Sequence, residues 1–104
     1  MKTGIELIAE ERQRQIEVEG WTAEHDAEHK NGELALAAAA YAVAEDGREN
    51  YREENFIPSW WPWDDSWWKP AIYKDNESRI RELQKAGALI AAEIDRLQAE
   101  EVQP

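Results

Sequence analysis

The feature that most constrains the fold is an apolar repeat near the C-terminal end of the chain. Its members are Ile80, Leu83, Gly87, Ile90, Ile94 and Leu97, at spacings of 3, 4, 3, 4 and 3. This alternation places residues on one stripe of an α-helix, as in helices that pack side by side. The repeat therefore predicts a helix over about residues 76–98, with Leu83, Ile90 and Ile94 buried against a neighbour.

Two further helices are predicted upstream. Residues 5–19 are strong helix formers without proline, and isoleucine recurs there at near-helical spacing before the stop at Gly20. Thr22 is a natural N-cap for a second helix that runs to about residue 45. A kink or break is expected at the Asn–Gly pair 31–32, because glycine costs about 1 kcal/mol inside a helix.

The second predicted helix carries the run "ELALAAAAYA" at residues 33–42. Its small side chains allow a close approach, which suits the patch formed by Ala86, Gly87 and Ala88. We therefore expect an all-α fold: a small bundle of about three main helices, antiparallel or bundle-like, without a sheet. It is a single domain over residues 1–104, with a frayed end from about residue 99.

A segment rich in tryptophan and proline joins the last two helices. "PSWWPWDDSWWKP", residues 58–70, holds five of the six tryptophans of the chain. Residues 46–76 lack a sustained apolar period, and long loops of this kind are usually functional or disordered, while tryptophan is a poor residue for disorder. We expect an ordered loop with a short helical turn around residues 64–68. Trp61 and Trp68 are expected to pack on the helices, and at least one other indole to line a cleft or an interface.

Composition narrows the classes of function. The net charge of −11 disfavours a nucleic-acid partner, and no window approaches the length of a membrane span or of a signal-peptide core. The absence of cysteine excludes disulfides and thiolate metal sites. These features predict a soluble, cytoplasmic protein. Large aliphatic residues are sparse, so burial of the small-residue face and of the loop predicts a homo-oligomer, most simply a dimer.

One face of the second helix carries the candidate metal ligands, which are His25, Asp26, His29 and Glu33. Offsets of three and four residues bring their side chains together. Carboxylates suit Mg²⁺ or Mn²⁺, whereas the imidazoles suit a transition metal. A plainer interpretation is that these are capping and first-turn charges.

The candidate catalytic residues are Glu33 and Glu93, because each carboxylate sits at the edge of an apolar helix face. They would converge on one cation if the second and third helices pair. The candidate substrate-binding residues are Trp63, Trp67, Lys69 and Lys85. Indoles stack on a base and ammonium groups neutralise phosphates, although a single lysine or glutamate is often only a solvated surface residue.

The blocks "EGWTAEHD", "GELALAAAAYA", "WPWDDSWWKP" and "KAGALIAAEIDRL" resemble a group of small proteins encoded by tailed phages and prophages. Similar domains occur joined to segments labelled dATP/dGTP diphosphohydrolase. The chain is more distantly similar to the all-α nucleoside triphosphate pyrophosphohydrolases of MazG type. That likeness implies an oligomeric, magnesium-dependent hydrolase that converts (deoxy)nucleoside triphosphates to monophosphate and pyrophosphate in a bacterial or phage-infected cell.

The chain departs from the MazG pattern at two positions. Glu33 stands alone before "LALA", where that family has paired glutamates, and Lys85 follows Glu82 where the family has an aspartate. A metal site is therefore either rebuilt from other side chains or absent. The candidates for a rebuilt site are His25, Asp26, His29, Glu33 and Glu93.

Two functions remain open at this point. One is a pyrophosphohydrolase in which the tryptophan loop stacks the base of the nucleotide. The other is a non-enzymatic, acidic binding module that engages a host or phage protein through its tryptophans, which are frequent hot-spot residues of interfaces. A third interpretation gives the tryptophans only a structural role as the filling of a small core.

Overall fold

A computed structural model describes residues 1–43, 51–52, 57–71 and 75–102 and confirms the all-α class. Its elements in chain order are α1 (Gly4–Glu17), α2 (Ala23–Asp26), α3 (Glu33–Ala42), β1 (Tyr51–Arg52), β2 (Ile57–Pro58), the 3-10 helix η2 (Asp65–Trp67) and α4 (Asn76–Val102).

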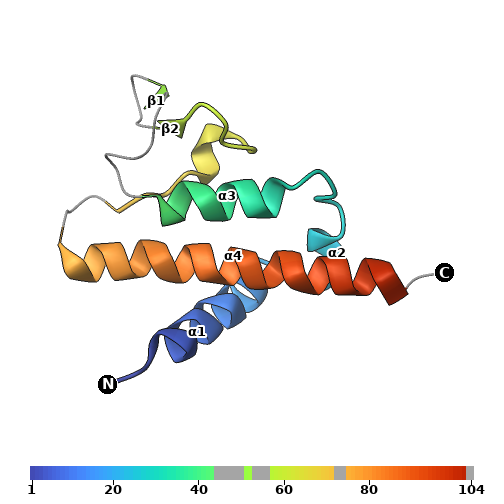
Figure 1. The fold of residues 1–104 in the computed structure, drawn as a ribbon, viewed down its shortest axis with the longest axis horizontal. Helices are drawn as coiled ribbons and strands as arrows, with labels where there is room; N and C mark the ends of the chain where they lie inside the picture. The colour runs from blue at the N-terminus through green and yellow to red at the C-terminus, as the bar shows by residue number, and fades with distance from the viewer. Residues whose placement is uncertain (44–50, 53–56, 72–74, 103–104) are drawn as a thin grey trace.

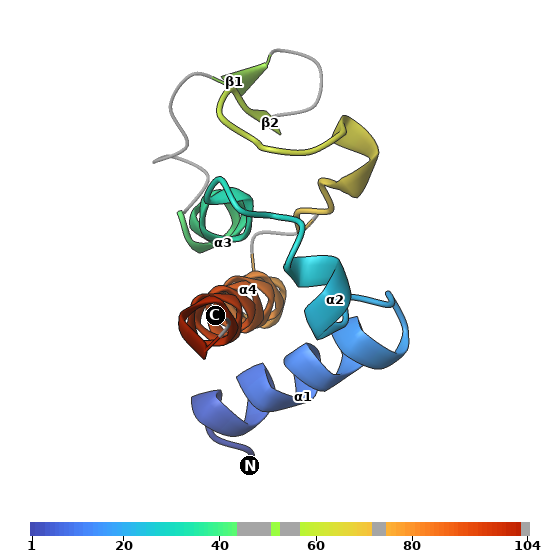
Figure 2. The ribbon, with the colours of Figure 1, turned by 90° about the vertical axis from the view of Figure 1, so that its right-hand side faces the viewer.

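Helix α4 is the axis on which the other helices pack. In Figure 1, α3 lies along α4 in the opposite direction, and α1 crosses α4 on its other side. Figure 2 looks along α4 and shows α2 and η2 on the same side of the α3–α4 pair. The core lies mainly between α3, α4 and the tryptophan segment. The predicted pairing of the alanine-rich helix with the C-terminal helix is confirmed.

Local sequence signals set the helix ends. The Thr3 hydroxyl accepts the Glu6 backbone N–H, and the Glu6 carboxylate accepts the Thr3 N–H at 3.0 Å, which is a capping box. The Thr22 hydroxyl accepts the His25 N–H, as expected of an N-cap. The helix predicted over residues 22–45 is broken: α2 ends at Asp26, and Gly32 has a φ of 81° just before α3. The weak point expected at residues 31–32 is therefore confirmed as a break.

The expected burial of the apolar repeat is wrong. Leu83, Ile90 and Ile94 are between 43% and 50% exposed. The buried hydrophobic side chains of α4 are instead Ala86, Ala88, Leu89 and Ala92. The alanine face of α3 packs on a stripe beside the repeat, where small α4 residues let the helices approach closely. The repeat was expected to be the packed surface of α4, but α3 packs on the adjacent stripe of small residues.

Gly87, in the middle of the repeat, is covered by α1 rather than by α3. A Cβ added to Gly87 would lie 2.5 Å from Cδ1 of Ile8. Real Cβ atoms essentially never come so close, so glycine lets α1 cross here. The glycine of the repeat is therefore a crossing point for α1.

Smaller differences from the expected fold concern a short strand pair and the C-terminal end of α4. β1 and β2 form a two-residue antiparallel pair where no sheet was expected. α4 continues to Val102, beyond the expected end at residue 98 and through the first part of the segment expected to fray. The helical turn expected around residues 64–68 is confirmed as η2. Parts of the expected loop at 46–76 lie outside the described residues. None of the described helices is long and apolar enough to cross a bilayer.

Candidate functional site

The tryptophan segment contributes two indoles to the core. Trp61 and Trp68 are buried, as expected, with ring centroids 4.9 Å apart. The Tyr41 ring of α3 lies 4.9 Å from Trp68 and 5.8 Å from Trp61. Hydrogen bonds fasten the segment: Trp61 Nε1 donates to the Asp64 carbonyl at 3.2 Å, and the Lys69 N–H donates to the Tyr41 hydroxyl at 3.0 Å. These contacts hold the segment rigidly over α3.

Two other tryptophans of the same segment, the half-buried Trp63 and the exposed Trp67, line a cleft. The cleft encloses about 240 Å³ and is lined by Trp21, His25, His29, Trp63, Asp64 and Trp67, which we call the Trp–His cleft. The Trp21 ring lies 6.0 Å from both the Trp63 and the Trp67 rings. Three indoles from two distant parts of the chain therefore wall one site, and the expected division of the tryptophans between core and cleft is confirmed.

Turns on either side of the cleft position these rings. The Asp64 carboxylate accepts the Ser66 N–H at 3.0 Å and starts η2, which places Trp63 and Trp67 on either side of this turn. Hydrogen bonds from Ser66 lower the pKa of Asp64, so its carboxylate is ionised at the cleft. On the other side, Gly20 at a φ of 75° reverses the chain, and the Trp21 N–H donates to the Gln15 carbonyl at 3.0 Å.

Two imidazoles, each paired with a carboxylate, complete the cleft. His25 Nδ1 lies 3.0 Å from Asp26 Oδ1, and His29 Nδ1 lies 3.5 Å from Glu33 Oε2. His25 stacks on Trp21 with ring centroids 6.0 Å apart and planes within 4°, and His29 lies 5.3 Å from Trp63. A carboxylate at Nδ1 fixes the orientation of each imidazole ring. The two oriented imidazoles therefore line an aromatic cleft.

The carboxylates behind the imidazoles are themselves held in place. Asp26 is buried and binds Arg12 Nη2 at 2.8 Å. Glu33 accepts the Asn31 N–H at 2.6 Å. Partial burial acts to raise the pKa of Glu33, but hydrogen bonds from the backbone of Glu33 and Asn31 and from His29 lower it overall. Both carboxylates are therefore fixed partners of the histidines.

The four predicted metal ligands form a chain of contacts. His25, Asp26, His29 and Glu33 follow one another through the two histidine–carboxylate contacts above, and the centroids of the two imidazole rings are 4.9 Å apart. Their carboxylates point to Nδ1 atoms and to Arg12 or backbone groups. Over the residues that the structure describes, no three acidic or histidine side chains form a group that could hold a metal ion.

The other predicted site residues divide between the cleft and other surfaces. Trp63 and Trp67 line the cleft, and the Lys69 ammonium lies 5.9 Å from the Trp67 ring. Lys85 is not a lining residue of the cleft: its ammonium donates to the Lys69 carbonyl at 2.9 Å and lies over the Tyr41 ring. Burial lowers the pKa of Lys85. Glu93 is not a lining residue of the cleft, and it binds Arg96 Nε at 2.6 Å.

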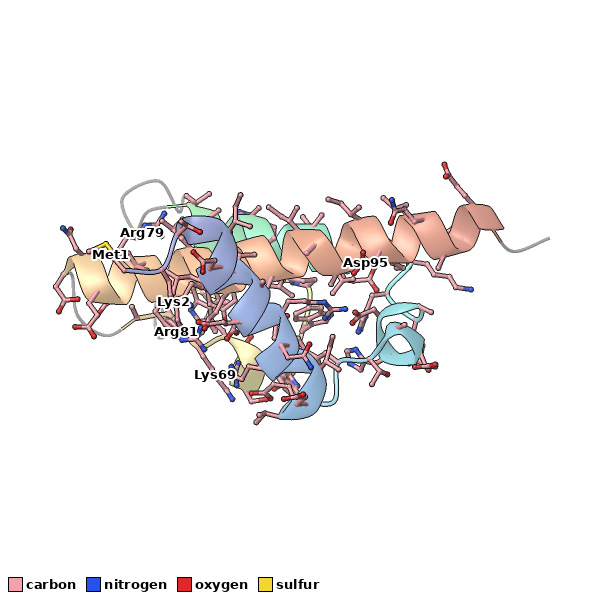
Figure 3. All side chains as sticks on the ribbon, turned by 90° about the horizontal axis from the view of Figure 1, so that it is seen from below. Met1, Lys2, Lys69, Arg79, Arg81 and Asp95 are labelled. Carbon is pink, nitrogen blue, oxygen red and sulfur yellow. The ribbon has the colours of Figure 1, made fainter. Side chains whose placement is uncertain are left out.

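Sequence reasoning missed an ionic cluster that joins α1 to α4. The buried Glu11 carboxylate binds Arg14 of α1 and Arg81 of α4, each at 2.8 Å. Figure 3 shows Arg81 beside α1. Glu11 is one of several glutamates in α1, and no local signal in the sequence distinguishes it from the others. Trp21 and Asp64 were also missed as lining residues, because their meeting depends on the packing of α2 against the tryptophan segment.

Comparison of the chain with protein-family models, with curated proteins and with solved structures finds no match. The resemblance to phage proteins and to MazG-type hydrolases therefore stays a prediction.

Proposed function

We propose that this chain handles nucleotides and that it holds the base of the nucleotide in the Trp–His cleft. The observation that carries the proposal is the group of three indole rings around one cleft, with two imidazoles held by carboxylates beside them. Stacking of a base on an aromatic side chain contributes about 1–3 kcal/mol. A planar, nitrogen-rich ligand therefore matches both the walls and the polar groups of the cleft.

The volume and polarity of the cleft narrow the ligand. About 240 Å³ is less than the roughly 300–1,000 Å³ of sites that enclose a drug-sized molecule, so one ring system fits better than a whole nucleotide. The polar groups of the lining side chains include the Asp64 carboxylate, which accepts hydrogen bonds, and the indole N–H groups of Trp21, Trp63 and Trp67, which donate them. They favour a base whose edge presents both donors and acceptors.

In the enzymatic form of the proposal, the phosphates lie outside the cleft near Lys69. A water molecule attacks a phosphorus of a (deoxy)nucleoside triphosphate, a P–O bond breaks, and monophosphate and pyrophosphate leave. Mg²⁺ or Mn²⁺ would neutralise the phosphates, and the phosphates would themselves supply ligands to the ion. The His29–Glu33 pair is our candidate for the general base that accepts a proton from the attacking water. Glu93 is a weaker candidate for this general base because its carboxylate binds Arg96.

A panel of nucleosides and triphosphates, titrated calorimetrically with and without Mg²⁺ or Mn²⁺, tests this proposal. Trp67→Leu removes one wall of the cleft, and Trp60→Leu is the matched control, because Trp60 packs on the core and is not a lining residue. We expect Trp67→Leu to weaken binding by about 5- to 100-fold, equivalent to the loss of one stacked ring, with little effect of Trp60→Leu. Product analysis of each bound triphosphate then tests hydrolysis. Failure of every base to bind the folded protein would contradict the proposal.

A second candidate function is an acidic module that binds a basic segment of a partner protein. The observation that favours it is electrostatic: among the residues that the structure describes, no lysine or arginine lines the Trp–His cleft, and the chain carries a net charge of −11. Guanidinium and ammonium groups bind well over tryptophan faces. Binding of an arginine-containing peptide should weaken steeply with salt, whereas stacking of an uncharged nucleoside should not. The salt dependence therefore separates the two functions.

We also propose that the protein acts in the cytoplasm and that it self-associates. The lack of cysteine supports the first proposal. Support for the second comes from apolar side chains that the fold leaves exposed on α4.

A further inference from the structure

The Trp–His cleft is walled by aromatic rings on several sides. The ring centroid of Trp21 lies 6.0 Å from those of Trp63 and Trp67, and the planes are tilted by 58° and 52°. Because the indoles are tilted rather than stacked flat on one another, all three line one space of about 240 Å³. The rings of His25 and His29 belong to the same lining. The cleft therefore surrounds a small ligand with aromatic surface.

The charges at the cleft favour a cation. Among the lining residues that the structure describes, Asp64 is the only carboxylate, and hydrogen bonds from Ser66 lower its pKa, so it is negative at neutral pH. Behind the imidazoles lie the carboxylates of Asp26 and Glu33. Arg12 offsets the charge of Asp26. The electrostatic field of these groups therefore attracts a positively charged ligand to the aromatic walls.

The hydrogen-bonding groups of the lining distinguish between classes of cation. A primary ammonium carries three N–H donors and a guanidinium five, and each donor needs an acceptor when it leaves water. The Asp64 carboxylate already accepts the Ser66 N–H, and the Nδ1 atoms of His25 and His29 face carboxylates. The indole N–H groups are donors themselves. A quaternary ammonium group has no N–H, so it leaves no donor unsatisfied while its methyl groups pack on the rings.

We propose that the Trp–His cleft is an aromatic cage for a quaternary ammonium group, carried by a small molecule of the choline type or by a trimethylated lysine side chain. Tryptophan attracts cations more strongly than the other aromatic residues do, and the attraction acts within about 6 Å of a ring centroid. Centroids 6.0 Å apart let one cation lie within this reach of more than one indole. The proposal rests on the second candidate function, the acidic module, and names the cationic group that it recognises.

Lys69 separates this ligand from a nucleotide. Its ammonium lies 5.9 Å from the Trp67 ring, and Lys69 is not a lining residue of the cleft. A positive charge at this place attracts phosphates but repels a cation in the cleft. Lys69→Gln should therefore tighten the binding of a quaternary ammonium ion by about 2- to 3-fold at low salt, and it should weaken the binding of a nucleoside triphosphate. Weaker binding of the quaternary ammonium ion to Lys69→Gln would count against the cage.

Two matched pairs of ligands, added to the full chain at constant ionic strength, test the proposal by NMR titration. Choline is compared with 3,3-dimethyl-1-butanol, which has the same shape without the charge. A peptide with one trimethyllysine is compared with the same peptide unmethylated. We expect the charged or methylated member of at least one pair to bind with a dissociation constant on the order of 1 mM or below, and at least about 10-fold more tightly than its counterpart.

The outcomes separate the source of the group and the two levels of the proposal. Tighter binding of choline indicates a small molecule, and tighter binding of the methylated peptide indicates a partner protein; both support the cage. Equal affinity within both pairs would overturn the cage and leave the acidic module standing if the peptides bind. Failure of all four ligands to bind at millimolar concentration would overturn the cage and the module together.

Substitutions of Trp67 test whether the ring itself attracts the cation. Trp67→Leu keeps apolar bulk without a ring, and Trp67→Phe keeps a ring that attracts cations less strongly. For the charged ligand that binds, we expect Trp67→Leu to weaken binding by about 3- to 30-fold and Trp67→Phe by less, with unchanged circular dichroism. Trp60→Leu is the control, because Trp60 packs on the core and does not line the cleft. Equal affinity of Trp67→Leu and Trp60→Leu for the cation would overturn the proposal.

Discussion

Replacing Glu11 with glutamine removes one charge from the cluster that joins α1 to α4. The Glu11 side chain is about 1% exposed and lies between Arg14 and Arg81, each at 2.8 Å. Gln15 Nε2 approaches it at 3.3 Å. Glutamine keeps the shape of the side chain but leaves two guanidinium groups without their shared anion. The substitution therefore isolates the electrostatic contribution of Glu11.

The structure sets the size of the expected loss. Removing one partner of a fully buried ion pair costs about 3–5 kcal/mol. Here Arg14 and Arg81 are 37% and 39% exposed, so water takes up part of the lost interaction. We expect the free energy of unfolding to fall by about 2–3 kcal/mol, which lowers the Tm by about 10–20 °C for a domain of this size. The control Glu19→Gln, at a more exposed partner of Arg14, should cost less than about 1 kcal/mol.

The pH dependence gives the same prediction an independent readout. Burial acts to raise the pKa of Glu11, but hydrogen bonds and charges from Arg14 and Arg81 outweigh it and lower the pKa overall. A folded-state pKa below the unfolded value gives stability that is present near neutral pH and lost as pH falls through the folded pKa. Urea unfolding below about pH 5 should therefore show a component of acid destabilisation in the wild type that Glu11→Gln lacks. A loss under about 1 kcal/mol at neutral pH, or equal acid slopes in both proteins, would refute this account.

Three further substitutions test packing and backbone geometry. Gly87→Ala should destabilise the protein by about 1 kcal/mol, since the clash with Ile8 exceeds the gain in helix propensity, and the sign should reverse in an Ile8→Ala background measured by urea unfolding. Gly32→Ala should cost about 1 kcal/mol in the same assay because of its φ of 81°, and a neutral effect would contradict that conformation. Trp68→Ala should cost about 3–5 kcal/mol, but Trp67→Ala, at a 44% exposed residue, less than about 1 kcal/mol; similar losses would show that Trp67 is also part of the core.

Short-range signals in the sequence predicted most of the fold. The cap at Thr22 and the break at Gly32 act within a few residues, so their outcome depends little on the remainder of the chain. The division of the tryptophans was also predictable, because closely spaced indoles between prolines cannot all face one way. Trp61 and Trp68 were assigned correctly to the core.

Long-range pairing was not predictable. The apolar repeat of α4 was expected to face another helix of the same chain, and Ile90 and Ile94 are instead half exposed. A periodic stripe identifies a packing surface but carries no information on which chain covers it. The role of Glu11 likewise depends on Arg81, which is far away in sequence and close only after α1 crosses α4.

The most direct test of the Trp–His cleft is a ¹⁵N NMR titration that follows the indole N–H signals. The signals are assigned by single tryptophan-to-phenylalanine substitutions, and deoxynucleosides and an arginine-containing peptide are then added in turn. We predict that a ligand which binds shifts the signals of Trp21, Trp63 and Trp67 together and leaves those of the buried Trp61 and Trp68 in place. Shifts confined to Trp61 and Trp68, or no shift of any indole signal with any of these ligands at millimolar concentration, would contradict the assignment of this cleft as the binding site.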